Sequence, residues 1–382
     1  MKILIYKWKA YNHYDLVQNL LRRDHNVDEI EGELLNFEED PYFERKLRKK
    51  LHEGGYDIMM SVNFFPLISD VCQSMGIRYV SWCCDSPISS MYNESIFNAV
   101  NTVFTFDKFN QLEFEEMGAP VYYLPLCTDC GRAAAVIDET KDYVADVSFV
   151  GSMYRKNSYD EVYDKLPEYY RGYFDAAIKL QMNVYGEYML DDVLDEKAVS
   201  DLQKYFVIAK GAKSFSDLEL IFSTTVLGFK IAQMERQAAI AELSPRCRVN
   251  VYTEEQEKFV LAHNMGTVDY WKEAPQVYNR SKINLNLTLR TIKTGIPLRV
   301  WDILGAGGFC LTNYQAELPL YFENGKDLVY FESRDEMLEK VSYYLAHDDE
   351  RREIAENGRR KVTELHSYMN RLDRMAEIVN GL

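Results

Sequence analysis

Residues 282–313 read KINLNLTLRTIKTGIPLRVWDILGAGGFCLTN, and this stretch decides the class of fold. It opens with a largely apolar run at 282–289, which is typical of a buried strand. A basic loop follows, and then a helical pattern with Pro297 in its first turn, where a missing N–H group costs nothing. A second apolar run closes the stretch at 309–313. Strand, helix and strand in this order predict two parallel strands of one sheet.

The first part of the chain has the same alternation. Five short apolar runs are separated by helical patterns, and we expect each run to form a strand. The runs lie at 2–6, 57–62, 77–83, 102–106 and 121–126. Strands that alternate with helices predict a doubly wound parallel sheet over residues 1–126, and ligands of such sheets bind at the carboxyl ends of the strands.

A second α/β domain is expected after a linker at 127–145. Its first strand is predicted at 146–151, and a helical stretch at about 158–243 interrupts the domain before the strands resume. The later strands are expected at 248–253, 266–270, 282–289, 309–313 and 327–333. We expect the domain to end at residue 364 and a last helix, 365–382, to pack back toward the first domain. The predicted fold class is α/β, with two Rossmann-like domains and a helical insertion in the second.

The composition excludes several classes of protein. The 382 residues are 47% hydrophobic, which is enough for two packed cores and too apolar for a disordered chain. A net charge of −16 argues against binding to nucleic acid, because a phosphate backbone repels an acidic surface. There is no run of about 18 apolar residues and no signal-peptide pattern, so we expect a cytoplasmic protein without a membrane span.

The seven cysteines leave two interpretations open. An odd number of cysteines in a large chain predicts reduced thiols and no disulfide framework. Cys127 and Cys130 have C-x-x-C spacing, and Cys83 with Cys84 could complete a four-thiolate zinc site. Adjacent cysteines are poor joint ligands, so we expect no metal site.

Basic residues gather near the start of the helix in the opening stretch. Arg290, Lys293 and Arg299 flank this start in the sequence. The first N–H groups of a helix, expected here near Gly295 and Ile296, have no partners within the helix, and the positive end of the helix dipole lies beside them. This combination favours a phosphate or diphosphate ligand.

A second anion-binding pattern follows the first strand of the second domain. Gly151 allows a ligand to approach the backbone closely, and Arg155 and Lys156 come soon after it. Basic residues after a strand are common at protein surfaces, so this loop alone is weak evidence. Two basic loops at strand ends of one domain together predict a site for a nucleoside diphosphate.

Asp302 lies three residues after Arg299, on the same face of the expected helix. A carboxylate does not bind phosphate, but it accepts hydrogen bonds from the hydroxyl groups of a ribose or a sugar. The alternative interpretation is that Arg299 and Asp302 form an ordinary surface ion pair and that the glycines merely end the helix.

Three longer motifs occur in order within residues 146–370: FVGSMYRK (149–156), GTVDYWKEAPQVYNRSKINLNLTL (266–289) and DILGAGGFCLTN (302–313). In these motifs the chain resembles the donor domain of the group 1 GT-B glycosyltransferases, whose two Rossmann-like domains face each other across a cleft. The resemblance implies that the first motif holds the donor diphosphate and that the nucleobase meets the backbone near Val268. It also places the aspartate at 302 in the position of the second of the family's two glutamates.

Two shorter motifs, DSP (85–87) and YLPL (123–126), together with GIPLRVWDILGAGGF (295–309), resemble the CgeB-like glycosyltransferases of spores and bacterial surfaces. This resemblance implies transfer of a sugar from a nucleotide-sugar to a glycan or protein acceptor. We expect a UDP-sugar as the donor, although the side chains do not distinguish uridine from guanosine. It implies no cofactor and no required metal ion. The chain departs from the family at the first glutamate, because Thr294 stands there, eight residues before Asp302.

The base that removes the proton of the acceptor is expected from the first domain. Asp85, in CCDSP, and His13, in KAYNHYD, both follow predicted strands. Each residue also has a simpler interpretation. Aspartate before Ser-Pro is typical of the start of a turn, which explains Asp85 as well as catalysis does, and a surface or helix-entry position explains His13 better than catalysis does.

Three other functions remain open. A nicotinamide or flavin enzyme fits two Rossmann-like domains, but no G-x-G-x-x-G motif follows the first strand. A catalytically silent module with this scaffold would bind a glycan or a partner without turnover, and Thr294 agrees with it. A nucleotide-sugar epimerase would need acid and base residues that the sequence does not single out. The sequence predicts no oligomeric state.

Overall fold

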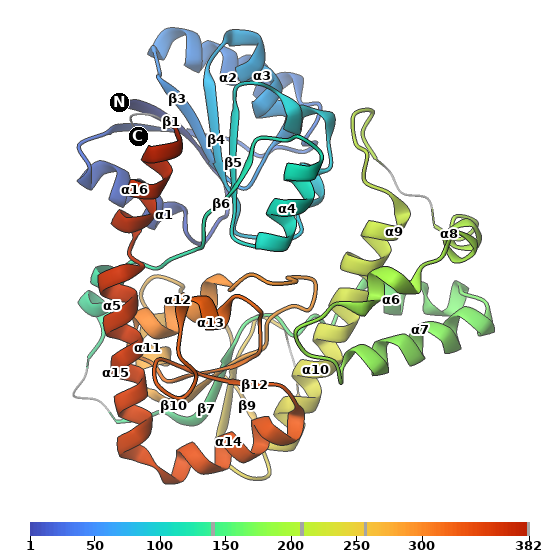
Figure 1. The fold of residues 1–382 in the computed structure, drawn as a ribbon, viewed down its shortest axis with the longest axis vertical. Coiled ribbons are helices and arrows are strands. Elements are labelled where there is room, and N and C mark those ends of the chain that lie inside the picture. The colour runs from blue at the N-terminus through green and yellow to red at the C-terminus, as the bar shows by residue number, and fades with distance from the viewer. Residues whose placement is uncertain (139–141, 207–209, 256–257, 380–382) are drawn as a thin grey trace. The chain divides into compact units, whose positions relative to one another are not determined.

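The structure is a computed structural model, and it describes residues 1–138, 142–206, 210–255 and 258–379. The chain divides into two compact units. Unit 1 contains Met1–Thr128, Ile208–Asp217 and Ser367–Leu382, and unit 2 contains Asp129–Val207 and Leu218–His366. Each unit is built on one parallel sheet of six strands with helices around it (Figure 1). The predicted fold class is therefore confirmed.

The sheet of unit 1 has the order β2-β1-β3-β4-β5-β6, and all neighbouring strands are parallel. Its strands are β1 (Lys2–Lys7), β2 (Asn26–Glu31), β3 (Ile58–Val62), β4 (Arg78–Trp82), β5 (Asn101–Thr105) and β6 (Val121–Tyr123). Strand β3 is buried along its whole length, as expected where helices cover both faces of a parallel sheet. The strand order reverses between β1 and β3, which makes the sheet doubly wound.

The helices of unit 1 begin and end at residues of the expected kind. They are α1 (His13–Arg22), α2 (Pro41–Gly54), α3 (Pro66–Met75), α4 (Lys108–Glu116) and α16 (Tyr368–Val379), with 3-10 turns at Ser89–Met91 and Glu94–Phe97. Proline starts α2 and α3, and each ends at a glycine in the left-handed region, Gly55 or Gly76. Helix α16 packs against α1, so the end of the described chain is part of this unit.

The sheet of unit 2 has the order β12-β11-β10-β7-β8-β9 and is also parallel throughout. Its strands are β7 (Ala145–Val150), β8 (Val249–Tyr252), β9 (His263–Asn264), β10 (Ser281–Asn286), β11 (Cys310–Asn313) and β12 (Val329–Phe331). Its helices are α5 (Cys130–Val136), α6 (Ser158–Val162), α7 (Glu168–Gln181), α8 (Glu196–Leu202), α9 (Leu218–Ile221), α10 (Gly228–Leu243), α11 (Ala274–Asn279), α12 (Leu298–Gly305), α13 (Leu318–Tyr321), α14 (Arg334–Ala346) and α15 (Asp348–Leu365).

Some predictions of local structure are wrong. Residues 266–270 are a loop and not a strand, because Gly266 has a φ of +74° and the side chain of Asp269 accepts hydrogen bonds from the N–H groups of Trp271 and Lys272. Strand β2 was not predicted, because it lies at the edge of its sheet and only Ile30 of its residues is buried. The described part of the stretch 158–243 is largely helical, as predicted: it contains α6 to α10, and a π-helical segment, Phe222–Leu227, leads into α10.

Strand β10 has one apolar face and one polar face, and both are buried. Ile283 and Leu285 belong to the hydrophobic core of unit 2. Their neighbours Asn284 and Asn286 point to the other face, because side chains alternate along a strand, and they are 1% and 0% exposed. Buried amides are costly unless they are hydrogen-bonded, so this face must supply partners.

Those partners come from the two adjacent strands. Ser148 of β7 donates to Oδ1 of Asn284 over 2.8 Å, and Nδ2 of Asn286 donates to Thr312 of β11 over 2.9 Å. The bonds satisfy the buried amides and link three strands side to side. The carboxyl ends of β7, β10 and β11 are therefore held at fixed positions relative to one another.

Close packing of α15 gives a test of the fold. A Cβ atom at Gly358 would lie 2.3 Å from the carbonyl oxygen of Asp327 and 2.7 Å from Cδ2 of Leu304. The backbone cannot move aside as a flexible side chain can, so we expect Gly358→Ala to lower the free energy of unfolding by about 1–3 kcal/mol. Urea denaturation measures the change.

Gly172→Ala is the matched control for this prediction. Gly172 lies within α7, and a Cβ atom there would meet no described atom within 4 Å. Alanine is the better helix former, so we expect this variant to be as stable as the wild type or more stable by about 0.5–1 kcal/mol. Equal losses of stability in both variants would contradict the packing described for α15.

Candidate functional site

Two arginines from different helices lie at the carboxyl end of β7. Arg299 is in the first turn of α12, and Arg236 is on α10. Both guanidinium groups lie near the ring of Phe149 in β7, with Cζ 5.9 Å and 5.3 Å from its centre, respectively. A Cβ atom at Gly151 would lie 2.7 Å from Nη2 of Arg299, so the glycine that follows β7 leaves room for this side chain. We call Arg236 and Arg299 the arginine pair.

Acidic side chains do not neutralise the arginine pair. Within the described part of the chain neither guanidinium group forms an ion pair. Arg236 is 3% exposed and donates to the carbonyl oxygens of Ser152 and Leu287 over 2.5 Å and 2.9 Å, while its Nε has no partner. Burial first, and also the charge of Arg299, lower the pKa of Arg236 to about 10. Because two such charges repel each other, an oxyanion between them would be strongly stabilised.

One carboxylate anchors the loop after β7. Glu255 accepts hydrogen bonds from the hydroxyl of Ser152 and the N–H of Met153, each over 2.8 Å, and from the hydroxyl of Thr253. Burial raises the pKa of Glu255, but these hydrogen bonds outweigh it and lower the pKa overall. The loop that begins at Gly151 is therefore held in a defined conformation beside the arginine pair.

The same loop contains a residue in an unusual conformation. Tyr154 has a φ of +50°, which is uncommon for a bulky residue and points to a constraint from its surroundings. Its ring stacks on Phe229 with the centres 4.8 Å apart, and Cζ of Arg236 lies 4.7 Å from its centre. Arg155 and Lys156, the predicted diphosphate ligands, follow at once and have exposed side chains. Both predicted basic residues thus belong to a loop at the end of β7.

Two other predicted cations are engaged in ion pairs. Arg290 is buried, and its Nη2 lies 2.6 Å from Oε1 of Glu235, while Nζ of Lys293 lies 2.6 Å from Oδ2 of Asp191. Burial lowers the pKa of Arg290, but the neighbouring carboxylate of Glu235 raises it overall. Arg290 therefore has a carboxylate partner, whereas the two residues of the arginine pair have none among the described residues. A role for Arg290 at a phosphate stays a prediction.

Helix α12 begins at Leu298, so Pro297 is its N-cap and does not lie in the first turn as predicted. Gly295 and Ile296 are buried in the loop before the helix. In the same loop, Thr294 donates from its hydroxyl to Oε1 of Glu317 over 2.7 Å. The residue that stands at the first acidic position of the resembled family is thus hydrogen-bonded to a carboxylate from the loop after β11.

Asp302 does not form the surface ion pair that was its alternative interpretation, because Arg299 forms no ion pair. Asp302 is 7% exposed, and its Oδ2 accepts a hydrogen bond from the hydroxyl of Tyr270 over 2.9 Å. Val268, two residues before this tyrosine, lines a cavity of about 360 Å³ between β8 and α11. The residues predicted for hydroxyl groups and for a nucleobase are therefore connected through one loop.

In unit 1, Asp85 follows β4 and is exposed. Nδ2 of Asn63 donates to Oδ2 of Asp85 over 2.8 Å, and Oδ1 of the same amide accepts from the N–H of Cys84 over 2.9 Å. Asn63 follows β3 and has a φ of +63°, a conformation that asparagine adopts more readily than most residues. Next to it, Ser86 donates to Asp107 over 3.0 Å. Strand ends of unit 1 thus hold Asp85 at the carboxyl edge of the sheet.

His13 is the first residue of α1, as predicted for a helix entry, but it is not at the surface. It is 6% exposed, and its Nε2 lies 2.7 Å from Oε1 of Glu29 on β2. Burial raises the pKa of Glu29, but hydrogen bonds from His13 and Lys7 lower it overall. The described partner of His13 is thus on β2, and its catalytic role stays a prediction.

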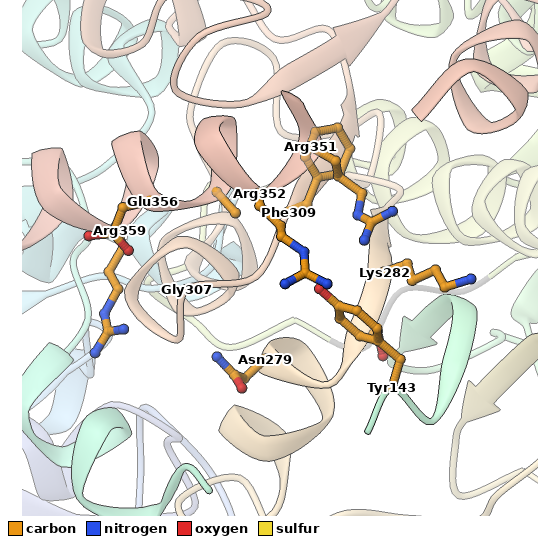
Figure 2. A pocket seen from close by; sticks show the side chains of 11 residues that line it. Tyr143, Asn279, Lys282, Gly307, Phe309, Arg351, Arg352, Glu356 and Arg359 are labelled. Carbon is orange, nitrogen blue, oxygen red and sulfur yellow. The ribbon is translucent and has the colours of Figure 1, made fainter. Parts of the chain in front are cut away.

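A smaller cavity, of about 170 Å³, lies at the opposite, amino ends of β10 and β11. Figure 2 shows arginines of α15 and Lys282 of β10 around it. Arg351 and Arg352 both pair with Asp348, and Lys282 lies 2.8 Å from Asp146. Carboxylates therefore pair with at least three of the four cations that line this cavity, the fourth being Arg359, whereas no described carboxylate pairs with the arginine pair.

The described residues contain no group of three or more His, Cys, Asp or Glu side chains placed to hold a metal ion. None of the seven cysteines forms a disulfide, and Cys127 and Cys130 of the C-x-x-C pattern belong to different units. Burial raises the pKa of the Cys130 thiol, which makes it a poorer nucleophile and ligand. No helix in the described ranges has both the length and the apolar composition to cross a membrane.

Comparison with known proteins agrees with this geometry. Residues 234–377 match the profile of a family described as "Glycosyl transferase-like". A sucrose-phosphate synthase from Thermosynechococcus elongatus has a similar structure, at 9% identity over 99% of this chain and 98% of that chain, with a TM-score of 0.58. The fold is that of the GT-B glycosyltransferases.

Two further structures with this fold are similar. The Anabaena protein HepE in complex with UDP-glucose is 10% identical over 100% of both chains, with a TM-score of 0.55. A glycosyltransferase from Rickettsia africae is 10% identical over 100% of this chain and 99% of that chain, with a TM-score of 0.50. No curated protein sequence matches. At these identities the likeness shows the GT-B fold alone, and the CgeB-like assignment stays a prediction.

Sequence analysis missed Arg236, although the sequence contains a signal for it. Ile240 and Leu243 lie four and seven residues after Arg236, on the same buried face of α10. A charged residue within an apolar helical stripe is expected to be buried. Because burial of a charge is costly, such a residue needs a specific partner or ligand. Asn63 gave no comparable signal, because only the fold brings it to Asp85.

The hydrogen bonds of Glu255 predict a dependence of stability on pH. Its pKa in the folded protein is lower than its ordinary value of 4.5. The unfolded chain therefore takes up a proton before the folded protein does, so its contribution to stability is present above pH 4.5 and is lost as the pH falls through the lowered pKa. We expect the free energy of unfolding of Glu255→Gln to fall less steeply than that of the wild type over this window.

Denaturation by urea at a series of pH values below 5 measures this difference. Glu254→Gln, a change of the adjacent exposed glutamate, is the matched control and should follow the wild type. Parallel pH profiles for the wild type and Glu255→Gln would show that the carboxylate does not anchor the loop.

Proposed function

We propose that the protein is a glycosyltransferase that moves a sugar from a nucleoside-diphosphate sugar, by preference a UDP-sugar, to a glycan, glycoprotein or other surface acceptor. The arginine pair carries this proposal. Arg236 and Arg299 present two positive charges without carboxylate partners at the carboxyl ends of parallel strands, where ligands of such sheets bind. Both residues lie within 234–377, the part of the chain that matches the glycosyl transferase-like profile.

In this reaction the bond between the anomeric carbon and the β-phosphate oxygen breaks, and negative charge develops on the leaving diphosphate. The arginine pair would stabilise that charge through hydrogen bonds between guanidinium and phosphate. Arg236 is already fixed by the carbonyl oxygens of Ser152 and Leu287, so its charge needs little reorganisation when the bond breaks. In this proposal no metal ion is assigned a role, and activity in the presence of EDTA tests that assignment.

Two observations support the rest of the donor assignment. HepE, which shares the fold, has been solved with UDP and with UDP-glucose, and this favours uridine as the base. Val268 lines a cavity of about 360 Å³, which is a candidate pocket for the base. Asp302, one turn after Arg299 on α12, would accept hydrogen bonds from hydroxyl groups of the ribose or the sugar.

A catalytically silent binding module is the second candidate. One observation favours it: Thr294 stands where the resembled family has its first glutamate. Such a module would bind the nucleotide-sugar without breaking it. Release of UDP from UDP-glucose, with or without an acceptor, therefore separates the two functions.

The arginine pair predicts a specific response to nucleotides. A ligand that binds only the folded protein, at about 100 times its Kd, raises the free energy of unfolding by about 2.7 kcal/mol. We expect UDP to do so in the wild type, and Arg299→Ala to lose most of this stabilisation. Because Arg299 is expected to stabilise the leaving group, turnover of UDP-glucose should fall by about 10²–10³-fold in the same variant. Unfolding curves with UDP, GDP, dTDP, CMP and NAD at matched concentrations measure the binding.

Arg352→Ala is the matched control for this experiment, because Arg352 lines the cavity at the opposite edge of the same sheet. UDP should stabilise this variant as much as the wild type. Stabilisation by NAD alone, or equal stabilisation of the wild type and Arg299→Ala by UDP, would contradict the proposal. No stabilisation by any nucleotide would contradict it as well.

The proposed base gives a second prediction. We assign the role of the base to Asp85, which is exposed and whose carboxylate is held by a hydrogen bond from Asn63. We expect Asp85→Asn to keep the affinity for UDP and to lower turnover of UDP-glucose by about 10²–10⁴-fold, because general-base catalysis contributes about that much. Asp57→Asn, an exposed aspartate whose side chain accepts the N–H of Lys2, is the control. Normal turnover in Asp85→Asn would exclude this residue as the base.

A further inference from the structure

Two loops of unit 2 are joined by reciprocal hydrogen bonds at the carboxyl ends of β10 and β11. The hydroxyl of Thr294, before α12, donates to Oε1 of Glu317 over 2.7 Å, and the N–H of Glu317 donates to the carbonyl oxygen of Thr294 over 3.1 Å. Nε2 of Gln315 also donates to the carbonyl oxygens of Ile292 and Gly295, over 2.7 Å and 3.1 Å. The carboxylate of Glu317 is therefore held at a defined position, within hydrogen-bonding distance of the side chain of Thr294.

A helix cap does not explain this carboxylate. Glu317 is the N-cap residue of α13, but its side chain makes no capping hydrogen bond to that helix. The carboxylate instead turns to the loop before α12, although Glu317 is 2% exposed and burial of a carboxylate is costly. A buried carboxylate that serves no helix end and lies at the ligand-binding edge of a sheet is a candidate for contact with a ligand.

The place of this carboxylate fits the sugar part of a nucleotide-sugar. The loop with Thr294 leads directly into α12, whose first turn carries Arg299 of the arginine pair. A sugar attached to a diphosphate presents hydroxyl groups, and an ionised carboxylate is the strongest hydrogen-bond acceptor that a side chain can offer to them. In the resembled family an acidic residue is expected at position 294 itself, where this chain has only a hydroxyl group.

We propose that Glu317, oriented by Thr294, accepts hydrogen bonds from hydroxyl groups of the donor sugar and so supplies the carboxylate that position 294 lacks. This inference rests on the proposed function. It makes Glu317 a sugar-binding residue contributed by the loop after β11, and it makes Thr294 its positioning residue. With Glu317 in this role, Thr294 would no longer favour a silent module.

The experiment compares binding of UDP-glucose with binding of UDP by titration calorimetry. Glu317→Gln keeps an acceptor for Thr294 but removes the charge. We expect it to weaken binding of UDP-glucose by about ten-fold or more, because a hydrogen bond to a charged group is lost, and to leave binding of UDP unchanged. Thr294→Val, which removes only the orienting hydroxyl group, should weaken UDP-glucose by a smaller factor and also spare UDP.

Glu323→Gln is the matched control, because Glu323 is exposed and its carboxylate pairs with Lys326. It should bind both ligands as the wild type does. Equal weakening of UDP and UDP-glucose in Glu317→Gln would mean that the carboxylate only supports the loops, and it would overturn the inference, as would unchanged binding of both. A wild-type protein that binds neither ligand would instead contradict the proposed function itself.

Discussion

Two guanidinium groups without carboxylate partners at the end of β7 are the feature on which the rest of unit 2 depends. Such charges are unfavourable near each other and in a protein interior, and each needs fixed partners of another kind. Arg236 obtains them from two backbone carbonyl oxygens, and both side chains lie near the ring of Phe149. Gly151 follows the strand because a side chain there would meet the guanidinium of Arg299. The residues at the end of β7 thus accommodate the two guanidinium groups.

Acidic residues of the inserted helices neutralise some of the basic residues near the arginine pair but not the pair itself. Helix α10 carries Glu235 and Arg236 as neighbours, and the glutamate pairs with Arg290 while the arginine adds to the charge of Arg299. A second acidic residue from the insertion, Asp191, pairs with Lys293. Cations of the loop before α12 are therefore neutralised by the insertion, whereas charge remains at the end of β7. This arrangement leaves two positive charges close together at the end of β7, in a chain whose net charge is −16.

The sequence predicts the sheets well because buried parallel strands are nearly continuous apolar runs. It predicts Gly151 and Arg299 as neighbours of one site for the same reason, since residues after such strands meet at one edge of the sheet. Partners far apart along the chain are not predictable in this way. Arg290 and Glu235 are 55 residues apart, so their pairing follows only from the way the insertion packs. Strand β2 escaped prediction because an edge strand has little apolar surface to bury.

The structure of the protein with bound UDP tests the central claim most directly. The account predicts that oxygens of the diphosphate lie within hydrogen-bonding distance, about 2.7–2.9 Å, of the guanidinium nitrogens of both Arg236 and Arg299. It also predicts that the loop after β7 keeps its bonds to Glu255. A diphosphate bound instead in the cavity beside Arg352, or away from both arginines, would contradict the account.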